Sequence, residues 1–171
     1  RKLSTSELLA DLRSQHPHWT QFVWDIWIRR VGPLWPLAGR IASLPFLPGG
    51  SSLETARALL PQETAAPWGR IKPAVQVGVG TPVAVFAGCT ARNARPGWIA
   101  RAETLLRRWG YVVLDGGGFT CCGGTLHHAG LFAAQAEVRR RNIERWRDMG
   151  RPVIAAFCAS CKHGLDAYAE E

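Results

Sequence analysis

The cysteines constrain the fold of this 171-residue chain most strongly, because all five lie between positions 89 and 161. They occur as one single residue, one adjacent pair and one Cys-x-x-Cys pair: Cys89, Cys121, Cys122, Cys158 and Cys161. One thiolate holds a soft metal weakly, whereas several together hold it tightly. An odd number of cysteines also cannot all form disulfides within one chain. The pattern therefore predicts a metal-sulfur site, with an iron-sulfur site as the working hypothesis.

The composition is that of a globular protein, with 47% hydrophobic and 20% charged residues. No apolar run reaches the roughly 18 residues that a membrane-spanning helix needs. Residues 1–10 lack the apolar core of a secretory signal. The thiols are thus expected in a reducing compartment, where clustered cysteines are more often ligands than disulfides. We expect a cytoplasmic protein, soluble or peripheral at the inner face of the membrane.

The net charge of +8 raises the question of a nucleic-acid partner. Residues 1–80 carry nine basic and five acidic side chains, and residues 81–171 carry twelve and eight, so the charge is evenly spread. The densest basic run, at 139–147, is interleaved with acidic residues at helical spacing. That spacing favours a solvated helix face with i to i+4 ion pairs over a phosphate-binding patch. We predict no nucleic-acid partner.

Residues 1–72 are expected to form a helical N-terminal segment and a linker. Ser4 and Glu7 have the spacing of a capping box, which predicts a helix from about Thr5. Apolar residues at helical period then form a stripe: Trp19, Phe22, Val23, Ile26 and Trp27. This tryptophan-rich stripe either packs on the protein's own core or docks on a membrane surface or a partner.

Two further features complete this segment. Residues 31–50 contain four prolines and four glycines, which predicts an irregular connection. Ser51 and Glu54 again have capping-box spacing, so a helix is expected over 52–60, followed by an extended linker over 61–73. A second domain is predicted over residues 73–171.

This second domain alternates strand and helix patterns. Short apolar runs predict buried strands at 82–87, 111–114 and 152–157. Apolar residues at helical period predict helices at 98–109, 126–149 and 160–169. The order βαβαβα implies an α/β fold in three layers, a parallel sheet with helices on both faces, preceded by the tryptophan-rich helical segment.

The cysteines all follow predicted strands, and the loops after parallel strands emerge at one edge of a sheet. Cysteines up to 72 positions apart can therefore meet. The glycines at 116–118 and 123–124 permit close backbone approach to a cluster. Three alternatives remain: a thioredoxin-like pair at Cys158 and Cys161, a four-ligand zinc site, and metal-free structural cysteines.

The spacing resembles a known family. Thirty-one residues separate Cys89 from the Cys121-Cys122-Gly123 run, and thirty-four more precede Cys158-x-x-Cys161. Over about residues 82–171, this is similar to the cysteine-rich domain with the Cys-Cys-Gly signature. That domain is known from heterodisulfide reductase and from the iron-sulfur subunits of glycolate oxidase, anaerobic glycerol-3-phosphate dehydrogenase and lactate-utilisation complexes.

The resemblance implies a 4Fe-4S cluster, of non-cubane type in some members, with zinc in others. By position, the implied ligands are Cys89, Cys121, Cys122, Cys158 and Cys161. It also implies an electron-transfer subunit of an oxidoreductase rather than a complete enzyme, with a flavoprotein dehydrogenase of a small hydroxy acid or similar metabolite as redox partner. The alternatives are a disulfide or heterodisulfide reductase and a zinc-stabilised interaction module.

A few other polar residues lie near these cysteines in the sequence. His127, His128 and His163 could tune a cluster or relay protons, because histidine titrates near neutral pH. Capping or surface roles are the commoner interpretation for such histidines. Asp115 is expected to cap its loop rather than to act as an acid.

Overall fold

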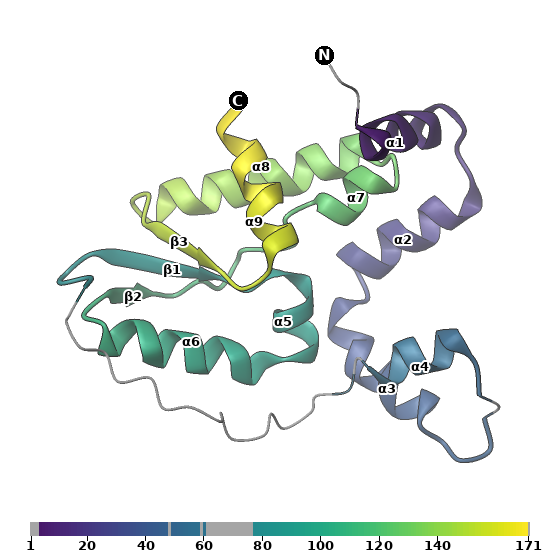
Figure 1. The fold of residues 1–171 in the computed structure, drawn as a ribbon, viewed down its shortest axis with the longest axis horizontal. Coiled ribbons are helices and arrows are strands. Elements are labelled where there is room, and N and C mark those ends of the chain that lie inside the picture. The colour runs from purple at the N-terminus through teal and green to yellow at the C-terminus, as the bar shows by residue number, and fades with distance from the viewer. Residues whose placement is uncertain (1–3, 48, 59, 61–76, 171) are drawn as a thin grey trace.

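The computed structural model describes residues 4–47, 49–58, 60 and 77–170. In this range the chain is a mixed α/β protein, with a small parallel sheet and a helical N-terminal arm beside it (Figure 1). The predicted linker at 61–73 lies outside the described residues, so the domain boundary stays a prediction.

The sheet has the three predicted strands, β1 (Pro82–Phe86), β2 (Val112–Leu114) and β3 (Val153–Ala156). Their order is β2-β1-β3, and both pairings are parallel. The central strand β1 is the most buried, because Val83 to Phe86 are each at most 3% exposed. An uninterrupted apolar run is typical of a strand covered on both faces.

The helices after β1 surround this sheet. They are α5 (Gly88–Ala94), α6 (Pro96–Arg108), α7 (Gly124–His128), α8 (Phe132–Asp148), α9 (Ala159–Asp166) and the 3-10 helix η2 (Ala167–Glu170). Helix α6 packs against β1 and β2, and α9 packs against β3. In Figure 1, α6 runs along the β2 side of the sheet, and α8 and α9 lie on the β3 side. The full three-layer arrangement predicted from the sequence is not confirmed.

The prediction of one continuous helix over 126–149 was wrong. The segment is two helices, α7 and α8, separated at Gly130. Gly130 has φ +75°, a left-handed conformation that ends a helix and that glycine adopts most readily. Its N–H donates to the His127 carbonyl, and Leu131 then starts the next helix.

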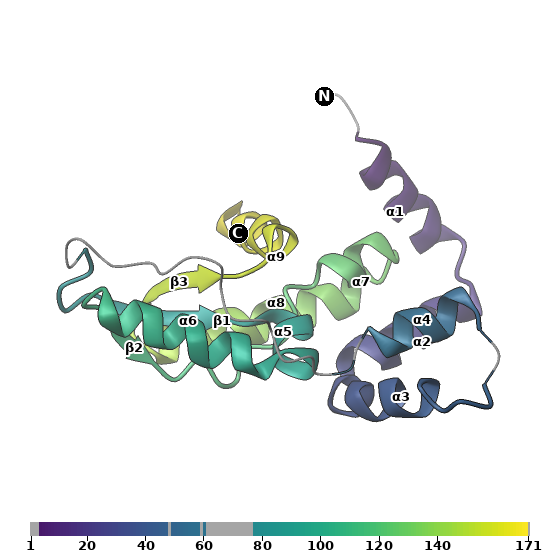
Figure 2. The same cartoon turned by 60° about the horizontal axis from the view of Figure 1, so that its bottom comes forward.

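The N-terminal arm consists of α1 (Thr5–Gln15), α2 (Trp19–Arg29), the 3-10 helix η1 (Gly32–Leu34), α3 (Trp35–Ala42) and α4 (Ser51–Arg57). Figure 2 shows this arm extending from one end of the sheet domain. The capping box of Ser4 and Glu7 is confirmed.

Two predictions for the arm were wrong. Residues 31–50 are not wholly irregular, because η1 and α3 lie within them. Both have proline in the first turn, where the helix makes no hydrogen bond to the N–H that proline lacks. The second capping box is also absent, since Ser51 already belongs to α4 and Gly50 is the N-cap, without a side-chain hydrogen bond.

The predicted apolar stripe on α2 is only half covered. Trp27 stacks on Trp35 with ring centroids 5.5 Å apart, whereas Trp19 and Phe22 are 69% and 67% exposed. Docking of this helix on a membrane or partner therefore stays a prediction. None of the helices in the described ranges is both long and apolar enough to cross a membrane.

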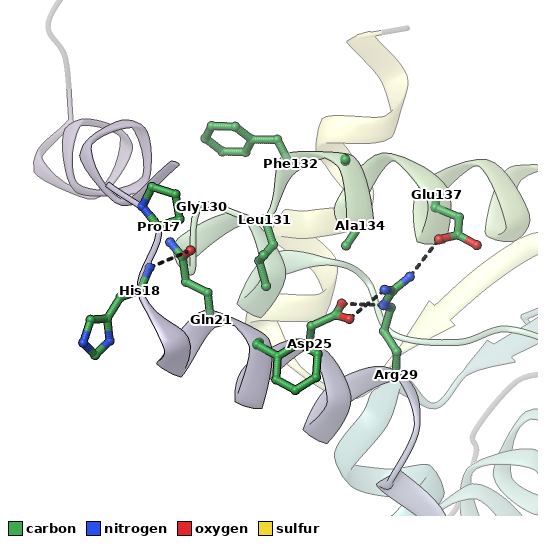
Figure 3. A pocket seen from close by; sticks show the side chains of 12 residues that line it. Pro17, His18, Gln21, Asp25, Arg29, Gly130, Leu131, Phe132, Ala134 and Glu137 are labelled. Atoms are coloured by element: carbon green, nitrogen blue, oxygen red, sulfur yellow. Dashed lines mark hydrogen bonds and ion pairs between the residues drawn. The ribbon is translucent and has the colours of Figure 1, made fainter. Parts of the chain in front are cut away.

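An ion-pair triad joins the polar side of α2 to α8. Arg29 lies between Asp25 and Glu137, with N–O distances of 2.5 and 2.7 Å (Figure 3). The sequence indicates the i to i+4 pair with Asp25, but the contact with Glu137 depends on tertiary packing. The groove above this triad has a volume of about 600 Å³, and none of its lining residues is a cysteine.

Helix α1 depends on a close backbone approach at Gly130. A Cβ atom there would lie 2.6 Å from the Ser14 nitrogen and 2.9 Å from the Ala10 carbonyl oxygen. We predict that Gly130→Ala lowers the free energy of unfolding by more than the ~1–2 kcal/mol that a left-handed alanine alone costs. We also predict faster hydrogen exchange throughout α1. Gly150→Ala is the matched control, because Gly150 has φ +79° and no atom within 4 Å of its Cβ position. Equal exchange rates of α1 in the two variants would contradict this packing.

Candidate metal centre

All five cysteines lie at the edge of the sheet where the parallel strands end. Cys89 is in α5, directly after β1, and Cys121 and Cys122 are in the loop between β2 and α7. Cys158 is the N-cap of α9, after β3, and Cys161 lies inside that helix. Parallel pairing of β1 with both neighbours thus brings three distant loops together, as the strand pattern predicts.

Four of these thiols interact with one another. Cys121 interacts with Cys89 on one side and with Cys122 on the other. Cys122 interacts in turn with Cys161. Cys121, Cys122 and Cys161 are only 6–7% exposed, and Cys89 is half-buried. The group is therefore a mostly buried row of sulfur atoms.

The pKa values of the thiols shift in both directions within this row. Interactions with Cys121 and Cys161 lower the pKa of Cys122 well below the usual range of a thiol. The pKa of Cys121 is raised by its interactions with Cys122 and Cys89 and by burial, and that of Cys161 is raised mainly by its interaction with Cys122. The pKa of Cys89 is lowered by its interaction with Cys121. The row therefore favours thiolates, the form that binds metals, at Cys89 and Cys122.

Cys158 differs from the other four because it is exposed. Its sulfur lies 2.9 Å from the Ser160 hydroxyl. Hydrogen bonds from that hydroxyl and from backbone amides in the first turn of α9 lower the pKa of Cys158. A helix N-terminus favours a thiolate in this way. Cys158 also interacts with Cys161, so it extends the row towards solvent.

Glycines make room for the sulfur atoms. A Cβ atom on Gly88 would lie 2.8 Å from the Cys161 sulfur, and one on Gly164 would lie 3.2 Å from the Cys122 sulfur. Gly88 also has φ +68°, which other residues adopt at a cost. The glycines that the sequence singles out, at 123 and 124, lie in the cysteine loop itself, and Gly123 has φ +86°.

Arginine side chains hold the loop that carries Cys121 and Cys122. Arg92 of α5 donates to the Phe119 carbonyl. Arg145 of α8 donates to the carbonyls of Gly117 and Asp115, at 2.9 and 3.2 Å. The basic run on α8 is thus only partly the solvated face predicted from the sequence, although Arg140 and Arg141 do pair with Glu144 and Glu137.

Two residues near the cysteines were not predicted from the sequence. Asn142 is the one buried polar residue of the described core and donates to the Cys121 carbonyl at 2.9 Å. Tyr168 of η2 donates to the Cys122 carbonyl at 3.0 Å. A signal for Asn142 does exist, since it lies four residues from Val138 and from Trp146 and so interrupts the apolar face of α8. Nothing local in the sequence marks Tyr168.

The candidate polar residues beside the cysteines have ordinary structural contacts. His127 lies 3.1 Å from the Gln135 amide oxygen and packs against Phe132. His128 is exposed, and its carbonyl accepts from Arg13. His163 is exposed on α9. Asp115 accepts from the Gly117 N–H at 2.8 Å, which is the loop-capping role expected for it.

Across the described ranges, no group of three or more Cys, His, Asp or Glu side chains is placed so that it could hold one metal ion. The five thiols nonetheless interact as one group, because the pKa of Cys161 responds to Cys122, Cys158 and Cys89.

Comparison with known proteins gives one match. Residues 83–166 match the family described as CCG, cysteine-rich domain. The matched range runs from β1 to the end of α9 and contains all five cysteines. No curated protein and no solved structure matches the chain.

The contact between Gly88 and Cys161 gives a direct test of this geometry. We predict that Gly88→Ala displaces the Cys161 sulfur and lowers the amount of metal bound per chain. Its left-handed backbone also lowers the free energy of unfolding by ~1–2 kcal/mol. Gly80→Ala is the matched control, because Gly80 has φ +71° but open space around its Cβ position. Denaturation and metal analysis of both variants check this, and equal metal content would place Cys161 away from the site.

Proposed function

Because residues 83–166 form a cysteine-rich domain of the Cys-Cys-Gly family, we propose that this chain binds an iron-sulfur cluster and transfers electrons within an oxidoreductase complex. The observation that carries the proposal is the row of interacting thiols that three separate loops deliver to one sheet edge.

The adjacent cysteine pair and the number of cysteines support a cluster over a single ion. Adjacent residues such as Cys121 and Cys122 rarely both reach one tetrahedral centre, whereas they can serve two irons of one cluster. A zinc site would also leave one of five cysteines without a role. The proposed ligands are those implied by the resemblance: Cys89, Cys121, Cys122, Cys158 and Cys161.

The surroundings fit such a group. The cysteines supply soft thiolate donors, and the low pKa of Cys122 keeps a thiolate available near neutral pH. Gly88 and Gly164 leave space beside the sulfurs that any side chain would fill. When bound, the cluster supplies one-electron transfer, and the chain sets its potential through burial and through hydrogen bonds to sulfur.

The proposed redox partner is a flavoprotein dehydrogenase that acts on a small hydroxy acid or a similar metabolite. This part of the proposal comes from the proteins whose cysteine spacing the chain resembles. The exposed end of the row, at Cys158, supports it, since a partner can approach there without unfolding the domain. The disulfide reductase alternative has no separate support among the described residues.

Anaerobic purification with iron, sulfide and zinc analysis tests the proposal. We predict a brown protein that contains iron and inorganic sulfide. Cys122→Ser should lower the iron content to roughly half of the wild-type value or less, because it removes a thiolate at the centre of the row. Ala159→Ser is the control, since it adds a serine hydroxyl at an exposed position beside Cys158 without removing a thiol.

Other results would contradict the proposal or favour one of its alternatives. A colourless protein with one zinc and no sulfide would contradict a cluster. A brown protein whose cluster responds only to an added heterodisulfide would favour the disulfide reductase alternative. Unchanged iron in Cys122→Ser would remove that residue from the ligand set.

A further inference from the structure

The two peptide units of the Cys-Cys-Gly loop are each fixed by a side chain from outside the loop. The carbonyl between Cys121 and Cys122 accepts from the Asn142 amide at 2.9 Å. The carbonyl between Cys122 and Gly123 accepts from the Tyr168 hydroxyl at 3.0 Å. The Asn142 amide also donates to the Tyr168 oxygen at 3.0 Å, so the two side chains act as one unit.

Fixing these carbonyls fixes the N–H groups on the other side of the same peptides. In a planar trans peptide the C=O and N–H bonds point in opposite directions. The peptide whose carbonyl is held by Tyr168 carries the Gly123 N–H, which donates to the Cys121 sulfur at 3.3 Å. Asn142 supports this orientation through its own hydrogen bonds to the Cys121 carbonyl and to the Tyr168 oxygen.

The unit is itself firmly held. Asn142 is 2% exposed, and its amide oxygen accepts from the Thr120 N–H at 2.9 Å. A buried amide is costly unless its polar atoms are bonded, and here both ends of the side chain are used. The Arg139 guanidinium lies 5.0 Å from the centroid of the Tyr168 ring and fixes its position. The geometry therefore cannot relax easily around either residue.

We propose that Asn142 and Tyr168 are positioning residues for the metal centre, because they fix the two peptides of the cysteine loop and so turn the Gly123 N–H towards the Cys121 sulfur. Hydrogen bonds to sulfur stabilise the reduced, more negative state of a cluster and so raise its reduction potential. The effect on potential rests on the proposed function. The orientation of the loop does not, and it is testable in the metal-free chain.

The first test measures the loop without metal. In the metal-free full chain, alkylation of Cys121 and Cys122 by iodoacetamide is followed for each cysteine by mass spectrometry. We expect Tyr168→Phe to speed this reaction roughly tenfold, because the loop that buries both thiols opens more often once one or two net hydrogen bonds are lost, while labelling of the exposed Cys158 stays unchanged. Tyr111→Phe removes the same hydroxyl at the opposite end of β2 and should leave all rates unchanged.

The second test separates positioning from general stability. Asn142→Leu and Tyr168→Phe are compared with Val138→Ala, which removes buried volume from the same core cluster but no hydrogen-bond donor to the loop carbonyls. In anaerobically loaded protein, the first two should shift the cluster's midpoint potential to more negative values. Val138→Ala should lower the melting temperature and leave the potential at the wild-type value.

The outcomes are distinct. Wild-type alkylation rates at Cys121 and Cys122 in Tyr168→Phe would overturn the proposal, whether or not the chain binds a cluster. The same holds if the potential shifts equally in all three variants or in none. A wild-type chain without iron and sulfide would instead contradict the proposed function, and the alkylation rates would still decide the role of Asn142 and Tyr168.

Discussion

Parallel pairing of one central strand with two neighbours is the constraint on which the rest of this structure depends. Strand β1 is hydrogen-bonded to β2 and β3 in the same direction, so the loops after all three strands leave the sheet at one edge. The cysteines lie in the segments that follow these strands. Burial of Val83 to Phe86 stabilises β1 and, through it, the position of every thiol. The proposed metal site is thus a consequence of the strand order.

Gathering thiols at that edge carries an electrostatic cost, because buried thiolates repel one another and are poorly solvated. Their interactions lower the pKa of Cys89 and Cys122 and raise that of Cys121 and Cys161. The proposed metal would offset the negative charge of the thiolates directly. The Gly123 N–H, which donates to the Cys121 sulfur, also offsets it, and Asn142 and Tyr168 hold the peptides of this loop in place.

Local patterns in the sequence were enough to predict the three strands and the common edge of the cysteines, because short apolar runs and strand-terminal cysteines are local features. They were not enough for α3, since Pro33 and Pro36 suggest a loop yet are tolerated in the first turn of a helix. The break at Gly130 was missed because its need for a left-handed backbone comes partly from contact with α1, far away in sequence. Tyr168 meets Cys122 across 46 positions, and no periodicity reveals such a contact.

The central claim is that cysteine thiolates at this sheet edge bind several irons bridged by sulfide. X-ray absorption at the iron and zinc edges of the anaerobically purified full chain tests it most directly. We expect iron surrounded by sulfur, with a second shell of neighbouring iron atoms and no stoichiometric zinc. Zinc bound by four sulfurs at about 2.3 Å, or iron coordinated only by nitrogen and oxygen, would contradict it.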